Sequence, residues 1–320
     1  MKQYRSRNYP LYIGFVLSAF FVLVALVGPS LAPQDPLEQF NDVLFIGDRS
    51  YIPSRNPIPP FRLEMFPLGT DNAGRDLLSR LLNAVRPTLI LSVTIVVVRL
   101  LIGTSLGLLA GWYQRAERLI DTLVGISLSV PILLFALAAI SFIGHKTLPT
   151  FILALTVTGW ANTAVFVKNS TRTTMQAPYI EGARAVGVKP LGILRYYILP
   201  QLWTALPALL AFELGAVILV IAELGFLGIF IGEAYVIIGE SANTAGTVAL
   251  GLTAGTAELA QMLSDFWSKM IHSPWEVVFV ALAIFLQIFA FNMLGEGLRR
   301  QMDITRPGRA RWRNRLIRQE

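Results

Sequence analysis

The stretch Tyr179–Pro200, YIEGARAVGVKPLGILRYYILP, decides how the whole chain is organised. It is polar and basic, whereas the runs on both sides are apolar and long enough to cross a membrane. An integral membrane protein that interrupts its spans with such a unit presents a docking surface to a partner on one side. The alternative is an ordinary basic loop, which has little need of about 20 ordered residues.

Helix signals punctuate this stretch at regular points. Pro178 suits the first turn of a helix, and Glu181 complements its positive end. Gly187 is a natural stop in left-handed geometry, and Pro190 opens a second short helix, which we expect to end before Pro200. We therefore predict two short helices at an angle, here called the elbow (residues 178–200).

The surface of the elbow is predicted to fit a groove in a partner protein. Its basic side chains are Arg184, Lys189 and Arg195. We expect a small apolar patch to accompany them, formed by Ile180, Ala183 and Val186.

Composition predicts an all-α integral membrane protein. The 320 residues are 54% hydrophobic and 15% charged, against about 25% charged in soluble domains. We predict about six transmembrane helices, at Leu11–Val27, Leu89–Ala110, Leu119–Ile143, Leu148–Val167, Leu206–Ile231 and Val277–Leu294. The absence of cysteine excludes disulfides and thiolate metal sites, and His145 and His272 are too separated to suggest a metal site.

Basic residues predict the orientation. With the N-terminus inside, 18 of the 27 Lys and Arg residues lie on inner segments and 8 on outer ones, which places both termini in the cytoplasm. The arginine-rich tail is interpreted as a topology anchor that meets anionic lipid, and not as a nucleic-acid site. Leu11–Val27 is expected to be an uncleaved span, because it exceeds the usual length of a signal-peptide core. Ala242–Leu263 is assigned to an external loop or a re-entrant segment, since another crossing would put the tail outside.

These predictions divide the chain into segments. They are an N-terminal tail and first span (1–31), an external Pro-rich segment with a lead-in helix (32–87), a transmembrane core (88–298) that contains a cytoplasmic coupling loop (171–205), and a basic cytoplasmic tail (299–320).

The end of the external segment is predicted to form a short amphipathic helix along the outer face. Thr70 or Asp71 is expected to cap it; the alternative is a plain lead-in helix with a turn at Gly69–Gly74. In the following span, Gly103, Gly107 and Gly111 form a small-residue ladder on one helical face, which favours close helix packing.

Three charged residues interrupt apolar runs, namely Arg99, Glu213 and Glu223. A central Arg costs about 2.5–3.5 kcal/mol on insertion scales, so it should face the bundle interior, a partner or water. We predict that Arg99 pairs with Glu213 or Glu223, or lines the transport path. Pro131 is expected to kink the third span.

The elbow resembles a known loop. Glu181, Gly182, Ala183, Gly187 and Tyr197–Pro200 match the Glu-Ala-Ala, three residues, Gly, nine residues, Ile-x-Leu-Pro loop that marks permease subunits of binding-protein-dependent ABC importers, with Gly182 replacing the first Ala and Tyr197 the Ile. This resemblance implies the type I ABC importer permease fold. It also implies that the ATPase-coupling residues are Glu181, Gly182, Ala183, Arg184, Gly187, Leu199 and Pro200.

A second resemblance narrows the branch. Phe66–Leu82, FPLGTDNAGRDLLSRLL, is similar to HPLGTDNLGRDVLSRLL of the C-type inner-membrane subunit of dipeptide/oligopeptide/nickel permeases. Further matches are LGFLG at Leu224–Gly228 and FNMLGEGLRRQMD at Phe291–Asp303. The external residues that carry the motif are Gly69, Thr70, Asp71, Gly74, Arg75 and Asp76. A glutamate of the family falls on Ile221, with Glu223 nearby, and residues 232–273 form a longer external stretch than is usual in the family.

The resemblance implies a heteromeric importer in the cytoplasmic membrane. Its partners would be a sister permease, two ABC ATPase subunits, an external solute-binding protein and membrane lipid, with no nucleic acid. The chain lacks a Gly-x-x-x-x-Gly-Lys-Ser/Thr loop, so we expect no enzyme activity and no bound cofactor or metal, with ATP used by the partner ATPases.

The substrate that the branch implies is a dipeptide or oligopeptide, with nickel or oligosaccharides as alternatives. The rival class is an ion-coupled secondary transporter. Such transporters often contain paired inverted repeats, and we find no clear internal repeat in this sequence. Copurification of two ATPases and a sister permease would distinguish the two classes.

Overall fold

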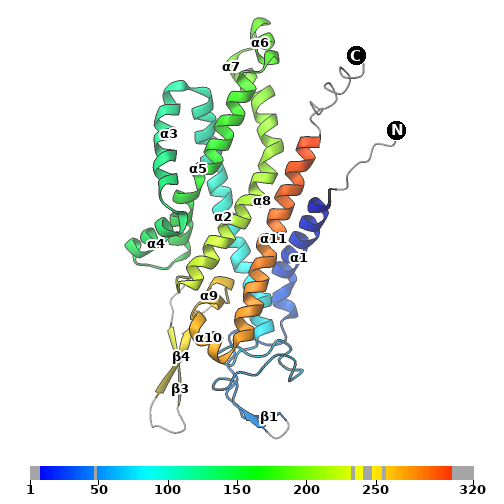
Figure 1. Ribbon diagram of the computed structural model, residues 1–320, viewed down its shortest axis with the longest axis vertical. Coiled ribbons are helices and arrows are strands. Elements are labelled where there is room, and N and C mark those ends of the chain that lie inside the picture. The colour runs from blue at the N-terminus through cyan, green and yellow to red at the C-terminus, as the bar shows by residue number, and fades with distance from the viewer. Residues whose placement is uncertain (1–7, 47–48, 232–234, 241–246, 254–256, 305–320) are drawn as a thin grey trace, which may run out of the picture.

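The computed structural model describes residues 8–46, 49–231, 235–240, 247–253 and 257–304. Five long helices run side by side along the length of the molecule and form its bundle (Figure 1). They are α1 (Tyr9–Leu31), α2 (Leu77–Trp112), α5 (Leu148–Met175), α8 (Leu199–Phe226) and α11 (Pro274–Ile304). Each is long and apolar enough to cross a membrane, as predicted.

The predicted third span is broken rather than kinked. It consists of α3 (Gln114–Ser129) and α4 (Ile132–Ile143), which meet at 88°. Val130 and Pro131 both have extended backbone between the two helices, because proline disfavours helical geometry in the residue before it. Counted as one bent crossing, the pair brings the number of crossings in the described chain to six.

The structure has the second of the two predicted forms, a plain lead-in helix preceded by a turn at Gly69–Gly74. Asp76, and not Thr70 or Asp71, caps the helix, and its Oδ2 accepts a hydrogen bond from Ser79 N at 2.8 Å. No separate short helix forms, since α2 runs through Pro87 to Trp112 as one helix of 36 residues. Thr70 and Asp71 are used instead in a turn that precedes the helix, described below.

The end of the bundle opposite the elbow carries two small sheets that an all-α prediction does not include. Strands β1 (Leu44–Ile46) and β2 (Arg49–Tyr51) pair antiparallel with Leu44 opposite Tyr51. Strands β3 (Tyr235–Glu240) and β4 (Thr247–Thr253) form a second hairpin with a register shift between Ile237 and Ile238.

Two short helices follow the second hairpin, α9 (Leu259–Leu263) and α10 (Phe266–His272). The stretch Ala242–Leu263, expected as a loop or a re-entrant segment, therefore contains a strand and a short helix, and its residues 242–246 and 254–256 lie outside the described residues. Leu259 and Met262 of α9 are fully buried against the bundle, so this part of the stretch belongs to the core.

The glycine ladder of α2 packs against α5, as predicted. A Cβ atom on Gly107 would lie 2.6 Å from the carbonyl oxygen of Ala164, and one on Gly103 or Gly111 would lie 2.7 Å from the Cβ of a threonine of α5. These distances are closer than real Cβ contacts, so the two backbones approach as near as glycine permits.

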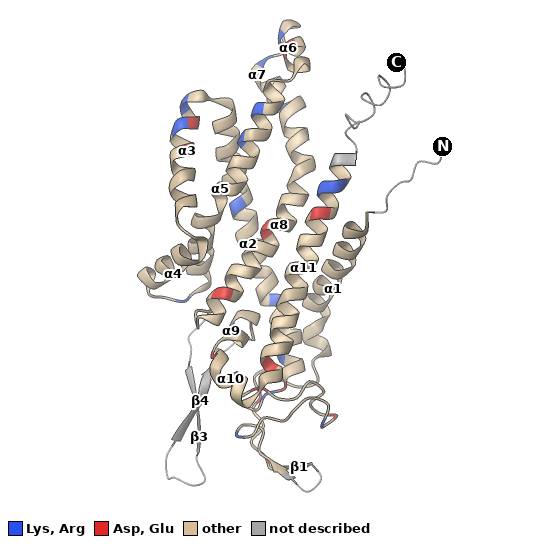
Figure 2. Ribbon diagram, viewed as in Figure 1, with Lys and Arg blue, Asp and Glu red and all other residues tan. Residues whose placement is uncertain are grey.

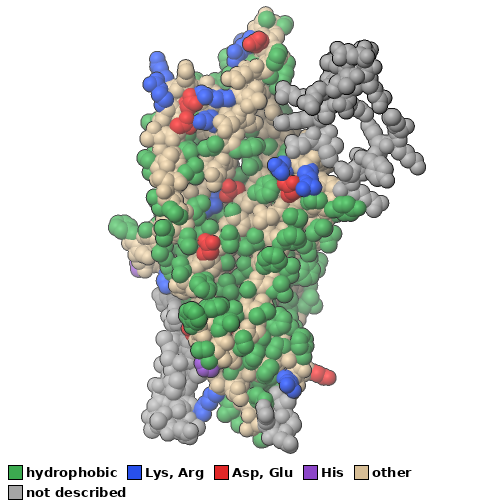
Figure 3. Space-filling model, in the orientation of Figure 1, with side chains coloured by type: hydrophobic (Ala, Val, Ile, Leu, Met, Phe, Trp, Pro, Cys, Tyr) green, Lys and Arg blue, Asp and Glu red, His purple; other side chains and the backbone are tan. Residues whose placement is uncertain are grey.

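Glycines also allow close packing of α1 against α11, which was not among the predictions. A Cβ on Gly14 would lie 2.1 Å from Leu294 N, and one on Gly297 would lie 2.3 Å from Leu11 Cα. Large apolar side chains cover the outside of the bundle, such as Phe15 and Leu26 of α1, so that the face in Figure 3 is mainly hydrophobic.

The two ends of the bundle differ. The start of α1 and the end of α11 lie at the same end as the short helices α6 (Pro178–Ala185) and α7 (Pro190–Ile193), whereas both hairpins, α9 and α10 lie toward the other end (Figure 1). Lys and Arg residues of the described chain are frequent near the α6–α7 end (Figure 2).

We expect Gly107→Val to destabilise the bundle by about 1–3 kcal/mol, because the added side chain must push α5 away from α2. The measurement is the thermal unfolding midpoint of the purified protein in detergent. Gly125→Val in α3 is the matched control, since a Cβ there meets nothing within 4 Å. Equal midpoints for the two variants would contradict the packing role of the ladder.

Candidate coupling elbow, external motif and intramembrane ion pair

The turn inside the elbow is closed by a complete Schellman arrangement. After α6, Gly187 N donates to the carbonyl of Arg184 at 2.9 Å and Val188 N to the carbonyl of Ala183 at 3.0 Å. Gly187 itself has φ = +85°, as predicted from the sequence, which an L side chain adopts only with strain. The angle between α6 and α7 therefore depends on this one glycine.

The elbow sits on a small apolar core of its own. Ile180, Ile193 and Ile198 are buried there together with Val167 and Leu202. Above this core, the rings of Tyr179 and Tyr197 stack with centroids 6.0 Å apart.

The exposed apolar patch of the elbow differs from the expected one. Ile180 and Ala183 are buried, and Ile180 belongs to the apolar core. Only Val186 of the predicted patch is exposed, and Leu191 and Tyr196 join it with exposed fractions of 78% and 69%. The elbow thus offers an apolar surface, but most of its members were missed by the sequence analysis.

The second helix of the elbow does not end before Pro200, and that prediction was wrong. α7 continues through one π-helical turn, Leu194–Ile198, directly into α8, so that Pro190–Phe226 forms one helical rod of 37 residues. Pro200 is accommodated because it falls in the first turn of α8, just after the π turn has shifted the hydrogen-bond register. Any displacement of α7 is therefore passed along α8 into the bundle.

Ion pairs hold α3 against α5 near the same end. Lys168 Nζ lies 2.6 Å from Asp121 Oδ1, and Arg172 contacts Glu117. Helix α5 ends at Met175, shortly before α6 begins at Pro178. The ion pairs therefore hold the helix that leads into the elbow.

At the opposite end, the external motif forms a buried polar turn. Asp71 is 1% exposed, and its carboxylate accepts from Ala73 N and Arg75 N at 2.9 Å and from Arg75 Nε at 2.7 Å, with Arg80 Nε 3.3 Å away. Thr70 Oγ1 accepts from Ile58 N at 2.8 Å. The structure thus brings the motif residues together around one buried carboxylate.

Two glycines of the motif let the turn lie against the preceding segment. Gly69 and Gly74 have φ values of +78° and +76°. A Cβ on Gly69 would lie 2.4 Å from the Ile58 carbonyl oxygen, and one on Gly74 would lie 2.5 Å from Ser54 N. Both positions therefore require glycine, for backbone conformation and for space.

The polar turn is tied to the C-terminal third of the chain. Glu276 at the start of α11 accepts from Asn72 N at 3.1 Å and pairs with Lys269 at 2.8 Å. Arg80 Nη2 donates to Gln261 Oε1 at 2.7 Å, and Trp275 Nε1 donates to the Thr70 carbonyl at 2.9 Å. We name these bonds together the external network. Gln261 and Glu276 carried no signal in the sequence because their partners Arg80 and Asn72 lie 181 and 204 residues away.

Arg99 crosses from α2 to α5 and α8 inside the bundle. Its Nε and Nη2 donate to the Leu155 carbonyl at 2.8 and 2.5 Å, and Nη1 lies 3.3 Å from Glu213 Oε2. Gly159 leaves room for the guanidinium, since a Cβ there would lie 1.9 Å from Arg99 Cζ. Of the two predicted partners, the structure pairs Arg99 with Glu213 and leaves Glu223 elsewhere.

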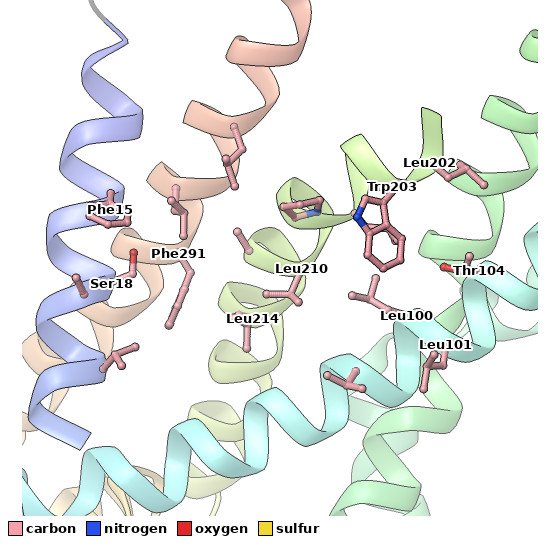
Figure 4. Close-up of a pocket in the computed structure, with 18 of the residues that line it drawn as sticks. Phe15, Ser18, Leu100, Leu101, Thr104, Leu202, Trp203, Leu210, Leu214 and Phe291 are labelled. Carbon is pink, nitrogen blue, oxygen red and sulfur yellow. The ribbon is translucent and has the colours of Figure 1, made fainter. Parts of the chain in front are cut away.

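A groove of about 850 Å³ opens between α1, α2, α8 and α11. In Figure 4, Trp203 of α8 extends into it beside Leu100 and Leu101 of α2, and Phe15 and Phe291 lie at its other side. Its lining is apolar apart from the hydroxyl groups of Ser18, Thr104 and Ser105. The groove therefore offers no charge to recognise a charged solute. Among the described residues, no group of His, Asp or Glu is placed to hold a metal ion.

The chain matches a family model described as binding-protein-dependent transport system inner membrane component over residues 100–303. It is 31% identical to the di/tripeptide transport system permease protein DppC of Pseudomonas aeruginosa, over 91% of this chain and 86% of that protein. It is 32% identical to the glutathione transport system permease protein GsiD of Pectobacterium atrosepticum, over 74% and 71%, and 28% identical to the dipeptide transport system permease protein DppC of Haemophilus influenzae, over 94% and 92%.

The chain therefore belongs to the inner-membrane permease family of binding-protein-dependent ABC importers. Membership makes it a multi-pass inner-membrane transport subunit of a system that also contains ATPase and binding proteins. This agrees with the resemblance drawn from the sequence.

We expect Asp71→Asn to destabilise the protein by about 3–5 kcal/mol, because two buried guanidinium groups lose their carboxylate. Thermal unfolding in detergent at pH 7 measures this, with the exposed Asp42→Asn as control. An unfolding midpoint within a degree of the control would contradict it.

The pH dependence of the external network follows from the same carboxylate. Burial by itself raises the pKa of Asp71, but the charges of Arg75, Arg80 and Lys269 and the Arg75 N–H together hold it below the ordinary value of 3.8. A lowered pKa gives stability that is present above the unfolded value and lost as pH falls through the folded one. The gap between wild type and Asp71→Asn should therefore stay constant from pH 7 to 5 and close only below about pH 3.8.

For the intramembrane pair, we expect Arg99→Leu to lower the unfolding midpoint more than the double variant Arg99→Leu/Glu213→Leu. The single change leaves a half-buried carboxylate without its cation, whereas the double change removes both charges. Thermal unfolding of both variants in detergent measures the difference. A double variant less stable than the single one would contradict the pairing.

Proposed function

We propose that this chain forms, together with a sister permease, the path by which an ATP-driven importer moves peptides across the cytoplasmic membrane. The names of relatives that align over most of both chains, permeases for dipeptides, di/tripeptides and glutathione, support a peptide substrate. Two ATPase subunits would bind from the cytoplasm, and an external binding protein would deliver the peptide.

The observation that carries this proposal is the continuity of the elbow with α8. The elbow projects beyond the bundle (Figure 1), its outer surface carries Val186, Leu191 and Tyr196, and its second leg runs unbroken to Phe226. A partner that moves the elbow therefore moves a membrane-spanning helix. We assign ATPase coupling to Glu181, Gly182, Ala183, Arg184, Gly187, Leu199 and Pro200, as the family loop implies.

Orientation follows from the same element. The elbow, the start of α1 and the end of α11 would face the cytoplasm, in agreement with the excess of basic residues at that end. The external network and the hairpins would then face the binding protein. ATP binding would close the ATPases, and the closing ATPases would pull on the elbow and favour an outward-open arrangement of the helices. Hydrolysis would then return the helices to their starting arrangement. In this cycle Arg99 and Glu213 hold α2, α5 and α8 in register.

The test is expression of the chain with its partner subunits, purification, and reconstitution into proteoliposomes with the binding protein. We expect two ATPases and a sister permease to copurify and peptide uptake to require ATP. Uptake driven by an ion gradient without ATP would contradict the proposal. A copurified metal or oligosaccharide on the binding protein, identified by mass spectrometry, would contradict the peptide substrate alone.

We expect Gly187→Val to lower substrate-stimulated ATPase activity of this complex at least tenfold while Gly187→Asn retains most of it. A side chain at residue 187 meets nothing within 4 Å, so the two variants differ mainly in backbone conformation. Asn tolerates the left-handed region, whereas a β-branched residue does not. Equal activity of the two variants would show that the angle of the elbow does not matter for coupling.

A further inference from the structure

A small cleft of about 360 Å³ lies where α4, the end of α8 and α9 meet. The cleft is lined by Leu133 of α4, by Leu263 of α9, by three residues in the last turns of α8 (Ala222, Glu223 and Phe226) and by Leu227, which caps α8. Glu223 is the one charged side chain in this described lining. The large groove between α1, α2, α8 and α11 offers no charge at all.

Glu223 differs from the other acidic residues nearby because its carboxylate is accessible and has no partner among the described residues. It is half-buried, and within the described residues no hydrogen bond or ion pair engages its side chain. Glu213, ten residues earlier on the same helix, pairs with Arg99. Glu258, before α9, is 3% exposed and accepts from the Ile231 backbone, and burial raises its pKa to about 7. Glu223 alone among these three is both reachable and unpaired in the described chain.

The cleft lies within the height of the bundle. In Figure 1, α4 and the end of α8 lie between the two ends of α11, and in Figure 3 acidic atoms interrupt a mainly hydrophobic face. A charged side chain at such a depth is costly unless it faces water or a cation. The helix is interrupted between α3 and α4 at Pro131, two residues before Leu133. Backbone outside a helix at this depth must also face protein or water, because it cannot face lipid.

We propose that Glu223 binds the positively charged amino end of the peptide during its passage. A peptide with a free amino terminus supplies the cation that the carboxylate lacks, and the apolar walls formed by Leu133, Phe226 and Leu263 accept side chains of varied shape. The cleft volume of about 360 Å³ is large enough for the terminal residue of a peptide. This inference rests on the proposed peptide substrate and adds a contact to it.

The first test is uptake by the complete reconstituted importer of two probes, trialanine and N-acetyl-trialanine. Glu223→Gln should lower uptake of trialanine about tenfold relative to that of the acetylated probe. The binding protein is the same in both preparations, so its own preference cancels in the ratio. Glu38→Gln, which removes an exposed external carboxylate, should leave the ratio unchanged.

The outcomes separate the two levels of the proposal. Equal loss of both probes, or no loss of either, in Glu223→Gln would overturn the role of Glu223 and leave the peptide importer standing. Failure of the unmodified importer to move trialanine would instead overturn the proposed function.

A second measurement does not depend on how the binding protein treats the acetylated probe. The chain has no cysteine, so Glu223→Cys creates a single reactive site in it. A water-soluble cationic methanethiosulfonate should label this variant in the assembled complex, and trialanine with binding protein and ATP should slow the labelling several-fold. Leu219→Cys, on an exposed part of α8, is the matched control. Labelling no faster than that of the control, or no protection by trialanine, would overturn the inference.

Discussion

Close approach of helix backbones is the constraint on which the rest of this structure depends. In hydrocarbon no hydrophobic effect drives helices together, so association relies on van der Waals contact and on polar bonds between helices. Gly103, Gly107 and Gly111 bring α2 against α5, and Gly14 and Gly297 bring α1 against α11. Only at this separation does the Arg99 guanidinium reach across Gly159 to the Leu155 carbonyl and to Glu213.

The two ends of the bundle are built on different physical principles. The end opposite the elbow is fixed by buried charges, since Asp71, Arg75 and Arg80 join the start of α2 to α9, α10 and the start of α11 through the external network. The elbow at the other end is held by a small apolar core and one left-handed glycine. A charged, tightly hydrogen-bonded end and an end built on a small apolar core are thereby separated along one helix bundle.

Charge inside the bundle is treated in two ways. Arg99 pairs with Glu213 and donates to the Leu155 carbonyl, which makes both charges part of the packing between three helices. Glu223 lies beside the break between α3 and α4, where helix geometry is interrupted and the described residues supply no cation. Glu213 therefore has a structural role in the middle of α8, whereas Glu223 near the end of the same helix has an unpaired carboxylate among the described residues.

The sequence by itself determined the membrane class, the long helices, the elbow with its positive-φ glycine and the glycine ladder, because each depends on local hydropathy, spacing or backbone preference. It also pointed to the external motif, although not to the buried carboxylate at its centre. Tertiary structure alone decided that Asp76 and not Thr70 or Asp71 caps α2, because Asp71 is taken by two arginines. It also decided that Ile180 and Ala183 are buried, that Pro200 lies within a continuous helix, and that Arg99 meets Glu213 and not Glu223. The burial of Ile180 and the Arg99–Glu213 pair depend on contacts between separate helices, and such contacts leave no local pattern in the residues that make them.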